Sequence, residues 1–336
     1  MTHPIVERLR SDDPEQRRSA CADAARDPSA ALFVEALCER LADPVHGVAS
    51  AASRALAQLA PRDAQVRRGL DRALRGEEPM RRWRAALTYP RFEPPSLKLL
   101  PVLIDASGAP DRHVRWATTK LLVDLGRLQP EVLPVLLERS HADPRPVARR
   151  MLVHALRGLA PDRSETARAL LAATQDRDAA VRRAALAGLA ALLDPPAEVL
   201  ERLCETLRGD DDAASRRIAA TALGALGARN AARVPPAAAT ALRSAARNAG
   251  DPDLRRAAAR ALDRIGGAAC RRGVADAESE RRTRPPAPAP CAWRRELVCS
   301  GPCGRTTICR SVPVCSSRPA SCARPRVAPA DREDST

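Results

Sequence analysis

Eight copies of one amphipathic segment constrain the fold of this chain more than any other feature of its sequence. The most regular copy is Asp176–Leu193, where Val181, Ala185, Leu189 and Leu192 form one apolar stripe at the period of an α-helix. Aligned on the first stripe residue, the copies are separated by 32, 32, 34, 34, 33, 34 and 39 residues. These first stripe residues are Gln16, Val48, Met80, Val114, Ala148, Val181, Ser215 and Leu254.

Two later positions repeat together with the first one. Seven of the eight residues are apolar at the nearer position and six at the farther one, and the exceptions lie in the first and third copies. Eight positions after the first stripe residue stand Ala24, Leu56, Thr88, Leu122, Leu156, Leu189, Leu223 and Leu262. Eleven positions after it stand Asp27, Leu59, Arg91, Leu125, Leu159, Leu192, Leu226 and Ile265. A fixed period in this range predicts an array of stacked units.

Each unit also contains an earlier helix and a turn rich in Asp and Pro. The clearest earlier helices are Ala30–Ala42, Ser96–Ser107, Glu131–Ser140 and Ala197–Arg208. Asp accepts hydrogen bonds from free N–H groups at a helix start, and Pro suits the first helical turn. The turns carry Asp13-Pro14, Asp43-Pro44, Pro110-Asp111, Asp143-Pro144, Asp176, Asp210 to Asp212, and Asp251-Pro252. One unit is therefore predicted to be helix, turn, helix.

The pattern D-P-x-x-x-V-R-x-x-A-x-x-A-L at the second helix resembles the HEAT repeat, in its short bacterial form. The resemblance covers about residues 3–266. It implies an all-α fold, a right-handed α-solenoid of about eight antiparallel helix pairs whose second helices line the concave side. It also implies a binding scaffold, although relatives include bilin lyase subunits, an iron hydroxylase and an alkyl-purine DNA glycosylase.

Composition agrees with close helix packing. Hydrophobic residues make up 45% of the chain but aromatic residues only 2%, so the core must consist mostly of Leu, Ala and Val. No apolar run reaches the 18 or so residues of a membrane span, and the amino-terminal segment lacks the apolar core of a signal peptide. We expect a cytoplasmic monomer. The third copy departs from the pattern, with Arg84, Thr88 and Arg91 at stripe positions and Pro90 ending the helix.

The sequence changes character after Gly266-Gly267. The tail, residues 267–336, holds seven of the ten cysteines, without a C-x-x-C pair or a histidine, and has no apolar periodicity. These properties argue against a zinc site and predict a disordered tail rich in Arg, Pro, Ala and Cys. Out-of-frame translation of a GC-rich gene would produce the same mixture of residues.

Arginine occupies the same two positions in nearly every unit, directly after the first stripe residue. The first column of this pair reads Arg17, Ala49, Arg81, Arg115, Arg149, Arg182, Arg216 and Arg255. The second column reads Arg18, Ser50, Arg82, Trp116, Arg150, Arg183, Arg217 and Arg256. Since stacked units place one repeat position along a line, these residues predict a cationic seam. In the family, the first arginine commonly pairs with a turn Asp in a ladder, so two interpretations stay open: a structural ladder with a solvated face, or a contact line for a partner.

Aromatic residues favour one place on that seam. Four of the six, Trp83, Tyr89, Phe92 and Trp116, lie where the repeat is least regular. Trp116 takes a slot that elsewhere holds Arg, which is typical of a binding hot spot; filling the core around an irregular turn is the alternative. We predict partner contacts at Arg18, Arg82, Arg115, Trp116, Arg150, Arg183, Arg217 and Arg256.

Signals for catalysis are weak. The five histidines form no His-Glu pair of the kind the iron hydroxylases require, and there is no glycine-rich phosphate loop. A glycosylase would need a groove acid beside Trp116, for which only Asp111 and Asp124 are available, and Asp111 is better explained as a helix cap. No catalytic residue, metal or cofactor is predicted. The sequence favours a non-enzymatic adaptor that binds a protein partner with an acidic segment, with a nucleic-acid-binding array as the main alternative and a bilin-lyase-type subunit as another.

Overall fold

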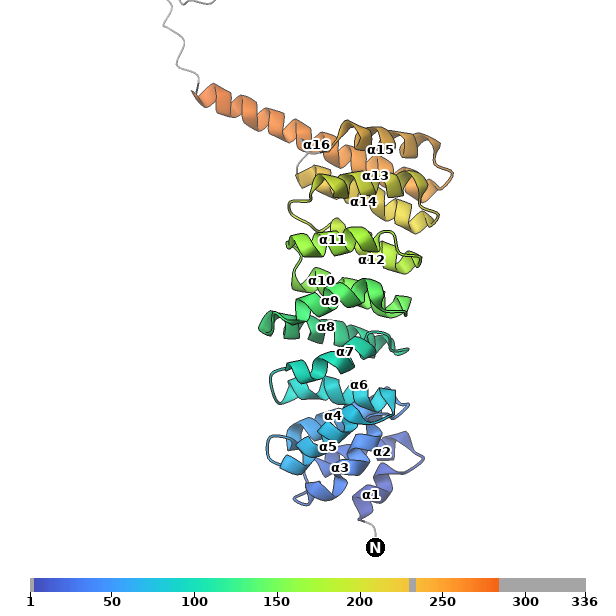
Figure 1. Ribbon diagram of the computed structural model, residues 1–336, viewed down its shortest axis with the longest axis vertical. Coiled ribbons are helices and arrows are strands. Elements are labelled where there is room, and N and C mark those ends of the chain that lie inside the picture. Colours follow the sequence, from blue (N-terminus) through green and yellow to red (C-terminus); the bar gives the residue numbers. More distant parts are fainter. Residues whose placement is uncertain (1–2, 230–233, 284–336) are drawn as a thin grey trace, which may run out of the picture. The chain divides into compact units, whose positions relative to one another are not determined.

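The helical array consists of eight stacked helix pairs. The computed structural model describes residues 3–229 and 234–283, with side chains as far as residue 267, and these residues contain no strand. The first helices of the pairs are α1 (Pro4–Leu9), α3 (Val34–Arg40), α5 (Ala64–Arg75), α7 (Leu100–Ala106), α9 (Val132–Ala142), α11 (Ser164–Ala173), α13 (Ala197–Gly209) and α15 (Pro236–Asn248). The second helices are α2 (Pro14–Ala24), α4 (His46–Leu59), α6 (Pro79–Thr88), α8 (Arg112–Leu128), α10 (Pro146–Leu159), α12 (Ala179–Leu189), α14 (Ala213–Arg229) and α16 (Pro252–Thr283). The predicted α-solenoid of eight pairs is confirmed (Figure 1).

The second helices form a continuous layer, because each packs against the second helix of the next unit from α2 to α16. Three short 3-10 helices complete the described structure: η1 (Ala30–Phe33), η2 (Tyr89–Arg91) and η3 (Leu97–Leu99). The carboxylates of Asp13 and Asp111 cap α2 and α8 by accepting from the amides two residues ahead, at 2.9 and 2.8 Å. No helix in the described ranges is long and apolar enough to cross a membrane.

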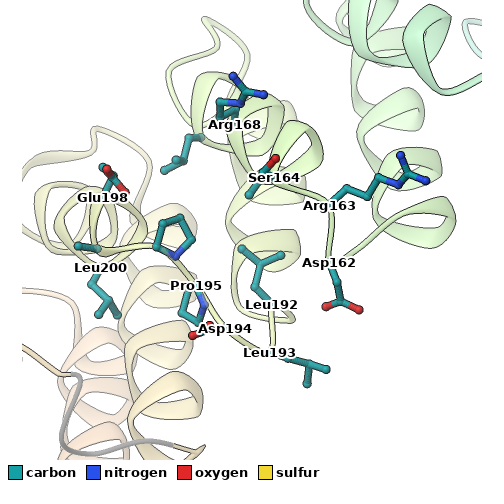
Figure 2. A pocket seen from close by; sticks show the side chains of 14 residues that line it. Asp162, Arg163, Ser164, Arg168, Leu192, Leu193, Asp194, Pro195, Glu198 and Leu200 are labelled. Carbon is teal, nitrogen blue, oxygen red and sulfur yellow. The ribbon is translucent and has the colours of Figure 1, made fainter.

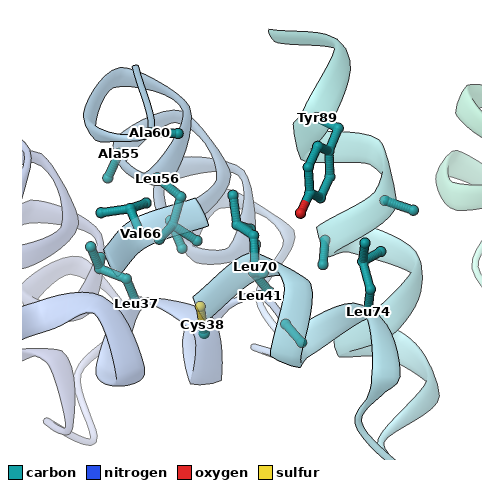
Figure 3. Packing of buried hydrophobic residues seen from close by; sticks show 14 of the residues in the cluster. Leu37, Cys38, Leu41, Ala55, Leu56, Ala60, Val66, Leu70, Leu74 and Tyr89 are labelled. Carbon is teal, nitrogen blue, oxygen red and sulfur yellow. The ribbon is translucent and has the colours of Figure 1, made fainter. Parts of the chain in front are cut away.

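Leucine and alanine fill the space between the layers, as the low aromatic content predicts. Figure 3 shows Leu37, Leu56 and Leu70 packed together from three successive helices, with Tyr89 at the edge of the group. The buried core is divided into two main clusters. Helix α10 contributes to both, with Leu152, Ala155 and Leu156 in the first and Val153 in the second.

The register of the third unit differs from the predicted one by a single residue. Second helices begin two residues before the first stripe residue in the other seven units, and α6 begins at Pro79. The stripe position is therefore Arg81 and not Met80, which evens out the spacing on either side. Eight positions on comes Tyr89, which is 1% exposed, so the apolar column is restored. The sequence alone does not reveal this register, because the neighbouring residue Thr88 is also fully buried. Its hydroxyl is paired with that of Ser53 at 2.9 Å, so a polar side chain is accommodated there.

Helix α16 continues past the predicted end of the array at residue 266, as far as Thr283. The structure differs here from the expectation of an unstructured tail over 267–283. This stretch is rich in Ala, Arg and Glu and contains no Pro before Pro285, so its intrinsic preference is helical. The rest of the predicted tail, residues 284–336, lies outside the described residues, as do the side chains of its cysteines.

Candidate functional site

In seven of the eight units, an arginine in the first turn of the second helix folds back onto the turn before that helix. Arg149 is typical: its Nη1 donates to the carbonyl oxygens of Asp143 at 2.8 Å and Pro144 at 3.3 Å. The donor is always bonded to the carbonyls six and five residues earlier. The same pattern is formed by Arg17, Arg82, Arg115, Arg182, Arg216 and Arg255. These side chains satisfy turn carbonyls and so hold the turn in place.

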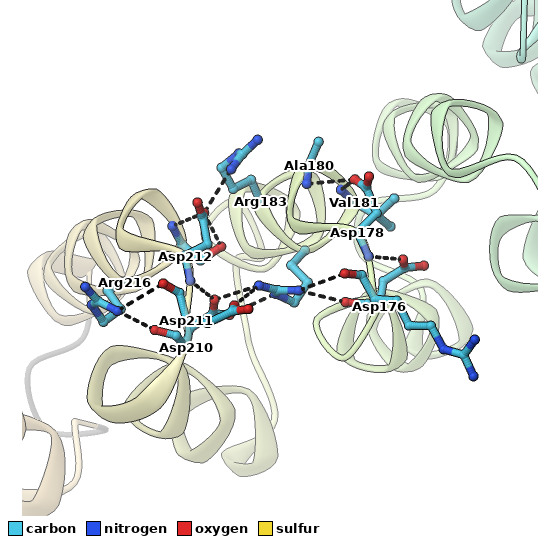
Figure 4. Close-up of polar contacts among 12 residues, drawn as sticks. Asp176, Asp178, Ala180, Val181, Arg183, Asp210, Asp211, Asp212 and Arg216 are labelled. Carbon is cyan, nitrogen blue, oxygen red and sulfur yellow. Dashed lines mark hydrogen bonds and ion pairs between the residues drawn. The ribbon is translucent and has the colours of Figure 1, made fainter.

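Three of these arginines also join consecutive units. The other edge of the guanidinium forms a two-pronged ion pair with the turn carboxylate of the next unit, and Figure 4 shows the turns that carry Asp176 and Asp210. Both side chains of each pair are at most 13% exposed. The pairs are Arg17–Asp43 at 2.7 Å, Arg149–Asp176 at 2.7 Å and Arg182–Asp210 at 2.9 Å. The first column thus forms a ladder between units at these three places.

Ladder carboxylates are held in their charged form. Burial raises the pKa of Asp176, but the hydrogen bonds from Arg149 and from the Asp178 amide outweigh burial, and the pKa is lowered overall. The pKa of Asp43 is lowered in the same way, by Arg17 and the Val45 amide acting against burial.

The register shift moves Arg82 out of the second column and into the first. Its Nη1 donates to the carbonyls of Gly76 and Glu77, and its Nη2 lies 3.0 Å from Asp105. Trp83 then takes the second-column position in this unit. It is 7% exposed and its indole Nε1 donates to Asp105 at 2.7 Å, so it belongs to the core.

Most second-column arginines are paired with acids. Arg183 lies 2.9 Å from Asp212, and Arg217 lies 3.4 Å from Asp251. Arg18 and Arg256 pair within their own helices, with Glu15 and Asp253 respectively. Arg150 has no ion pair within the described part of the chain. Four of the five second-column arginines therefore have an acid beside them, and the predicted contact line stays a prediction.

Trp116 stands out from these paired arginines. It is 53% exposed on α8, and its ring lies 5.2 Å, centroid to centroid, from the ring of His154 on α10. Burial, with the charges of Arg157 and Arg150, lowers the pKa of His154 to about 4. His154 is therefore neutral near pH 7, and its uncharged ring packs against the ring of Trp116.

A groove of about 430 Å³ opens on the same layer, between α4, α6 and α8. The rings of His46 on α4 and His113 on α8 lie 5.1 Å apart across it, so units two and four meet over the third. The groove is lined by His46, Ala49, Ser50, Ser53, Arg84, Leu87, Pro90, Arg91, His113, Val114, Ala117, Lys120, Leu121 and Asp124.

Cations outnumber acids in this groove. Arg84 is fixed at one side, where it donates to the carbonyls of Leu41 and Asp43 at 3.0 Å and to Asp111 at 3.2 Å. Arg91 and Lys120 are exposed and make no ion pair with other described residues. The sequence indicates this groove only indirectly, because Arg84 and Arg91 interrupt the apolar stripe of the third copy.

A larger cavity, of about 1130 Å³, lies between α11 and α13 (Figure 2). Leu192, Leu193 and Pro195 form an apolar wall, and Leu193 is 73% exposed. Acids and bases are mixed around it, with Asp162, Arg163 and Glu198 among the lining residues. No sequence pattern predicts this cavity, because its lining comes from two helices of neighbouring units and the segment between α12 and α13.

The thiols and carboxylates considered as candidates for catalysis are buried or bonded to other residues. The thiols of Cys21 and Cys38 are buried, which raises the pKa of each to about 12. No cluster of three or more His, Cys, Asp or Glu side chains able to hold a metal occurs among the described residues. Asp111 caps α8 and binds Arg84, while Asp124 lies 3.7 Å from Arg127.

Comparisons with known proteins agree with this architecture. The family model for HEAT repeats matches residues 69–157 and 166–263. Matching solved structures include a chain of a Kap95p and RanGDP structure (13% identity over 78% of this chain and 40% of that one, TM-score 0.51) and Kap121p (12% identity over 82% and 38%, TM-score 0.50). Human deoxyhypusine hydroxylase matches at 21% identity over 78% of this chain and 95% of that one, with a TM-score of 0.33.

At these identities the structural likenesses show the fold alone, and the chain spans about two fifths of the length of the two Kap chains. No curated protein sequence matches. The family model, in contrast, covers more than half of the residues and includes the ladder pairs Arg149–Asp176 and Arg182–Asp210. The chain belongs to the HEAT-repeat family.

Proposed function

We propose that this protein is a non-enzymatic scaffold that binds a protein partner on its second-helix layer, around Trp116. The observation that carries the proposal is the exposure of Trp116 beside cations that have no acid partner in the described structure. Tryptophan is enriched among the residues that contribute most to binding at the centres of protein interfaces. The ring of His154 packs against the indole of Trp116 and restricts its motion, which reduces the entropy that the side chain loses on binding.

The surrounding charge favours a partner segment that carries acidic residues. Arg150 follows on α10 and Lys120 lies one turn after Trp116 on α8, and neither is used in an ion pair among the described residues. An acid arriving here does not have to displace an existing partner. The proposed contact surface therefore retains Trp116 and Arg150 of the predicted line and adds Lys120.

The other predicted contact residues already bond to groups of the protein itself. Arg82 and Arg115 bond to turn carbonyls, while Arg183 and Arg217 face the acids of the next unit. A nucleic acid would need a continuous track of phosphate contacts, and these acids interrupt it. We therefore place nucleic acid second.

The full chain and two variants, Trp116→Ala and Leu193→Ala, test the proposal as baits in nuclease-treated native extract. Leu193 is the matched control, since it is an exposed apolar residue far along the chain from Trp116. We expect at least one protein to be retained by the parent and Leu193→Ala, and its affinity to fall about tenfold or more with Trp116→Ala. Urea unfolding midpoints should stay equal, because Trp116 is half exposed.

The same proteins on all three baits would contradict the proposal, as would a large loss of stability in Trp116→Ala. Titration with duplex DNA separates the alternative. Binding to DNA should weaken steeply with salt, linearly on logarithmic axes, with a slope set by the number of phosphates neutralised, and an acidic protein segment should show a shallower slope.

A further inference from the structure

We propose that the groove between α4, α6 and α8 is a binding site for a phosphate group carried on a small organic or aromatic skeleton. The proposal does not depend on a protein partner at Trp116. It stands on the charge of the lining, on the start of α4 and on the size of the groove.

The cations of the groove are arranged around one space. Arg84 supplies a fixed guanidinium at one side of the groove, where two carbonyl oxygens hold it and Asp111 balances its charge. Arg91 and Lys120 also line the groove and have no acid partner in the described residues, so both are available to an incoming anion. Asp124 is the sole acid among the lining residues, and Arg127 lies 3.7 Å from it. The space is therefore electropositive, and arginine with lysine is a combination that suits phosphate oxygens.

Helix α4 begins at the groove without a side-chain cap. Its N-cap residue is Val45, whose side chain has no acceptor, whereas α8 is capped by Asp111. No side chain caps the amides of His46 and Gly47, and the positive end of the helix dipole lies at His46, which lines the groove. Ser50, one turn further along α4, adds a hydroxyl to the same wall.

The volume of about 430 Å³ lies within the range of small-ligand pockets and exceeds that of phosphate alone. Leu87, Val114 and Leu121 form an apolar part of the wall. This part would contact the carbon skeleton of a phosphate monoester while the cations bind its oxygens. Phenyl phosphate carries a group for each part of the lining, a ring for the apolar residues and oxygens for the cations.

Calorimetric titration of the full chain with phenyl phosphate tests this assignment, with phenol and inorganic phosphate alongside. We expect phenyl phosphate to bind more tightly than either fragment. Lys120→Ala and Arg91→Ala should each weaken it about tenfold, whereas Lys98→Ala should leave it unchanged. Lys98 is the matched control, because it is the chain's other lysine and it pairs with Glu93 outside the groove.

Failure of phenyl phosphate to bind at millimolar concentration would overturn the proposal. Equal effects of Lys120→Ala and Lys98→Ala would overturn it too. A second arm identifies the source of the phosphate: a phosphotyrosine peptide that binds tenfold more tightly than phenyl phosphate indicates a protein ligand, and equal affinities indicate a small molecule. Lys120 belongs to both proposed sites, so two other variants separate them. Trp116→Ala should leave all of these titrations unchanged, and Arg91→Ala should leave the binding of the protein partner unchanged.

Discussion

Arg149 and Arg150 are adjacent on α10, yet the structure gives them different roles. Arg149 lies between its own turn and Asp176 of the next unit, whereas Arg150 reaches the surface near His154 without an ion pair to any other described residue. The sequence located both columns on one layer, but it could not separate paired from unpaired arginines. That distinction depends on where the next unit places its turn acid, which a single helix pattern does not encode.

Replacing these two arginines one at a time tests the ladder. Arg149→Ala leaves the carboxylate of Asp176, 10% exposed, without its cation, and should lower the free energy of unfolding by about 2 kcal/mol. Arg150→Ala should change it by less than about 0.5 kcal/mol. Urea unfolding followed by circular dichroism measures both, and equal losses would show that the ladder does not stabilise the contact between units.

At the scale of helices, the period predicted where all eight second helices lie, because an apolar stripe and an Asp/Pro turn recur together. It missed the register of α6 by one residue, since Thr88 and Tyr89 are both buried and either satisfies the pattern. It also missed the groove, which arises where α4 and α8 meet across α6. Contacts between units that are not neighbours in the sequence do not recur with the repeat, so the periodic pattern of residues does not predict them.

The close approach of α14 and α16 gives a second test. A Cβ added at Gly224 would lie 2.7 Å from the Cα of Ala261, so backbone must move. We expect Gly224→Ala to destabilise the protein by about 1–2 kcal/mol, because overpacking outweighs the gain in helix propensity. Gly209→Ala is the control: nothing lies within 4 Å of its added Cβ, and thermal unfolding should show no loss. If both variants were stabilised alike, the two helices would have to stand further apart.

At the scale of the whole molecule, the ladder makes stability depend on acid. Asp43, Asp176 and Asp210 all have pKa values lowered below the ordinary value, through hydrogen bonds to arginine that outweigh burial. A carboxyl with a lowered pKa in the folded state stabilises the fold at all pH values above its unfolded pKa, about 3.9. That stabilisation is lost as the pH falls through the lower, folded pKa.

The melting temperature should therefore be nearly constant from pH 7 to about pH 5 and fall steeply below about pH 4. Asp176→Asn should lower it at neutral pH and make the acid limb shallower. The same measurement on Glu138→Gln, which alters an exposed carboxyl, should follow the parent curve. A parent whose melting temperature does not fall in acid would show that the ladder carboxylates contribute little.

The buried core is divided at α10, and this division affects how the array unfolds. A stacked array is stabilised by each unit and by its contacts with its neighbours, so cooperativity between units is reduced where one apolar cluster gives way to the next. Heating would then melt the two halves as separate events, each on its own side of α10. A ligand clamped across α8 and α10 would strengthen only the amino-terminal half, and the gap between the two melting events would report its occupancy.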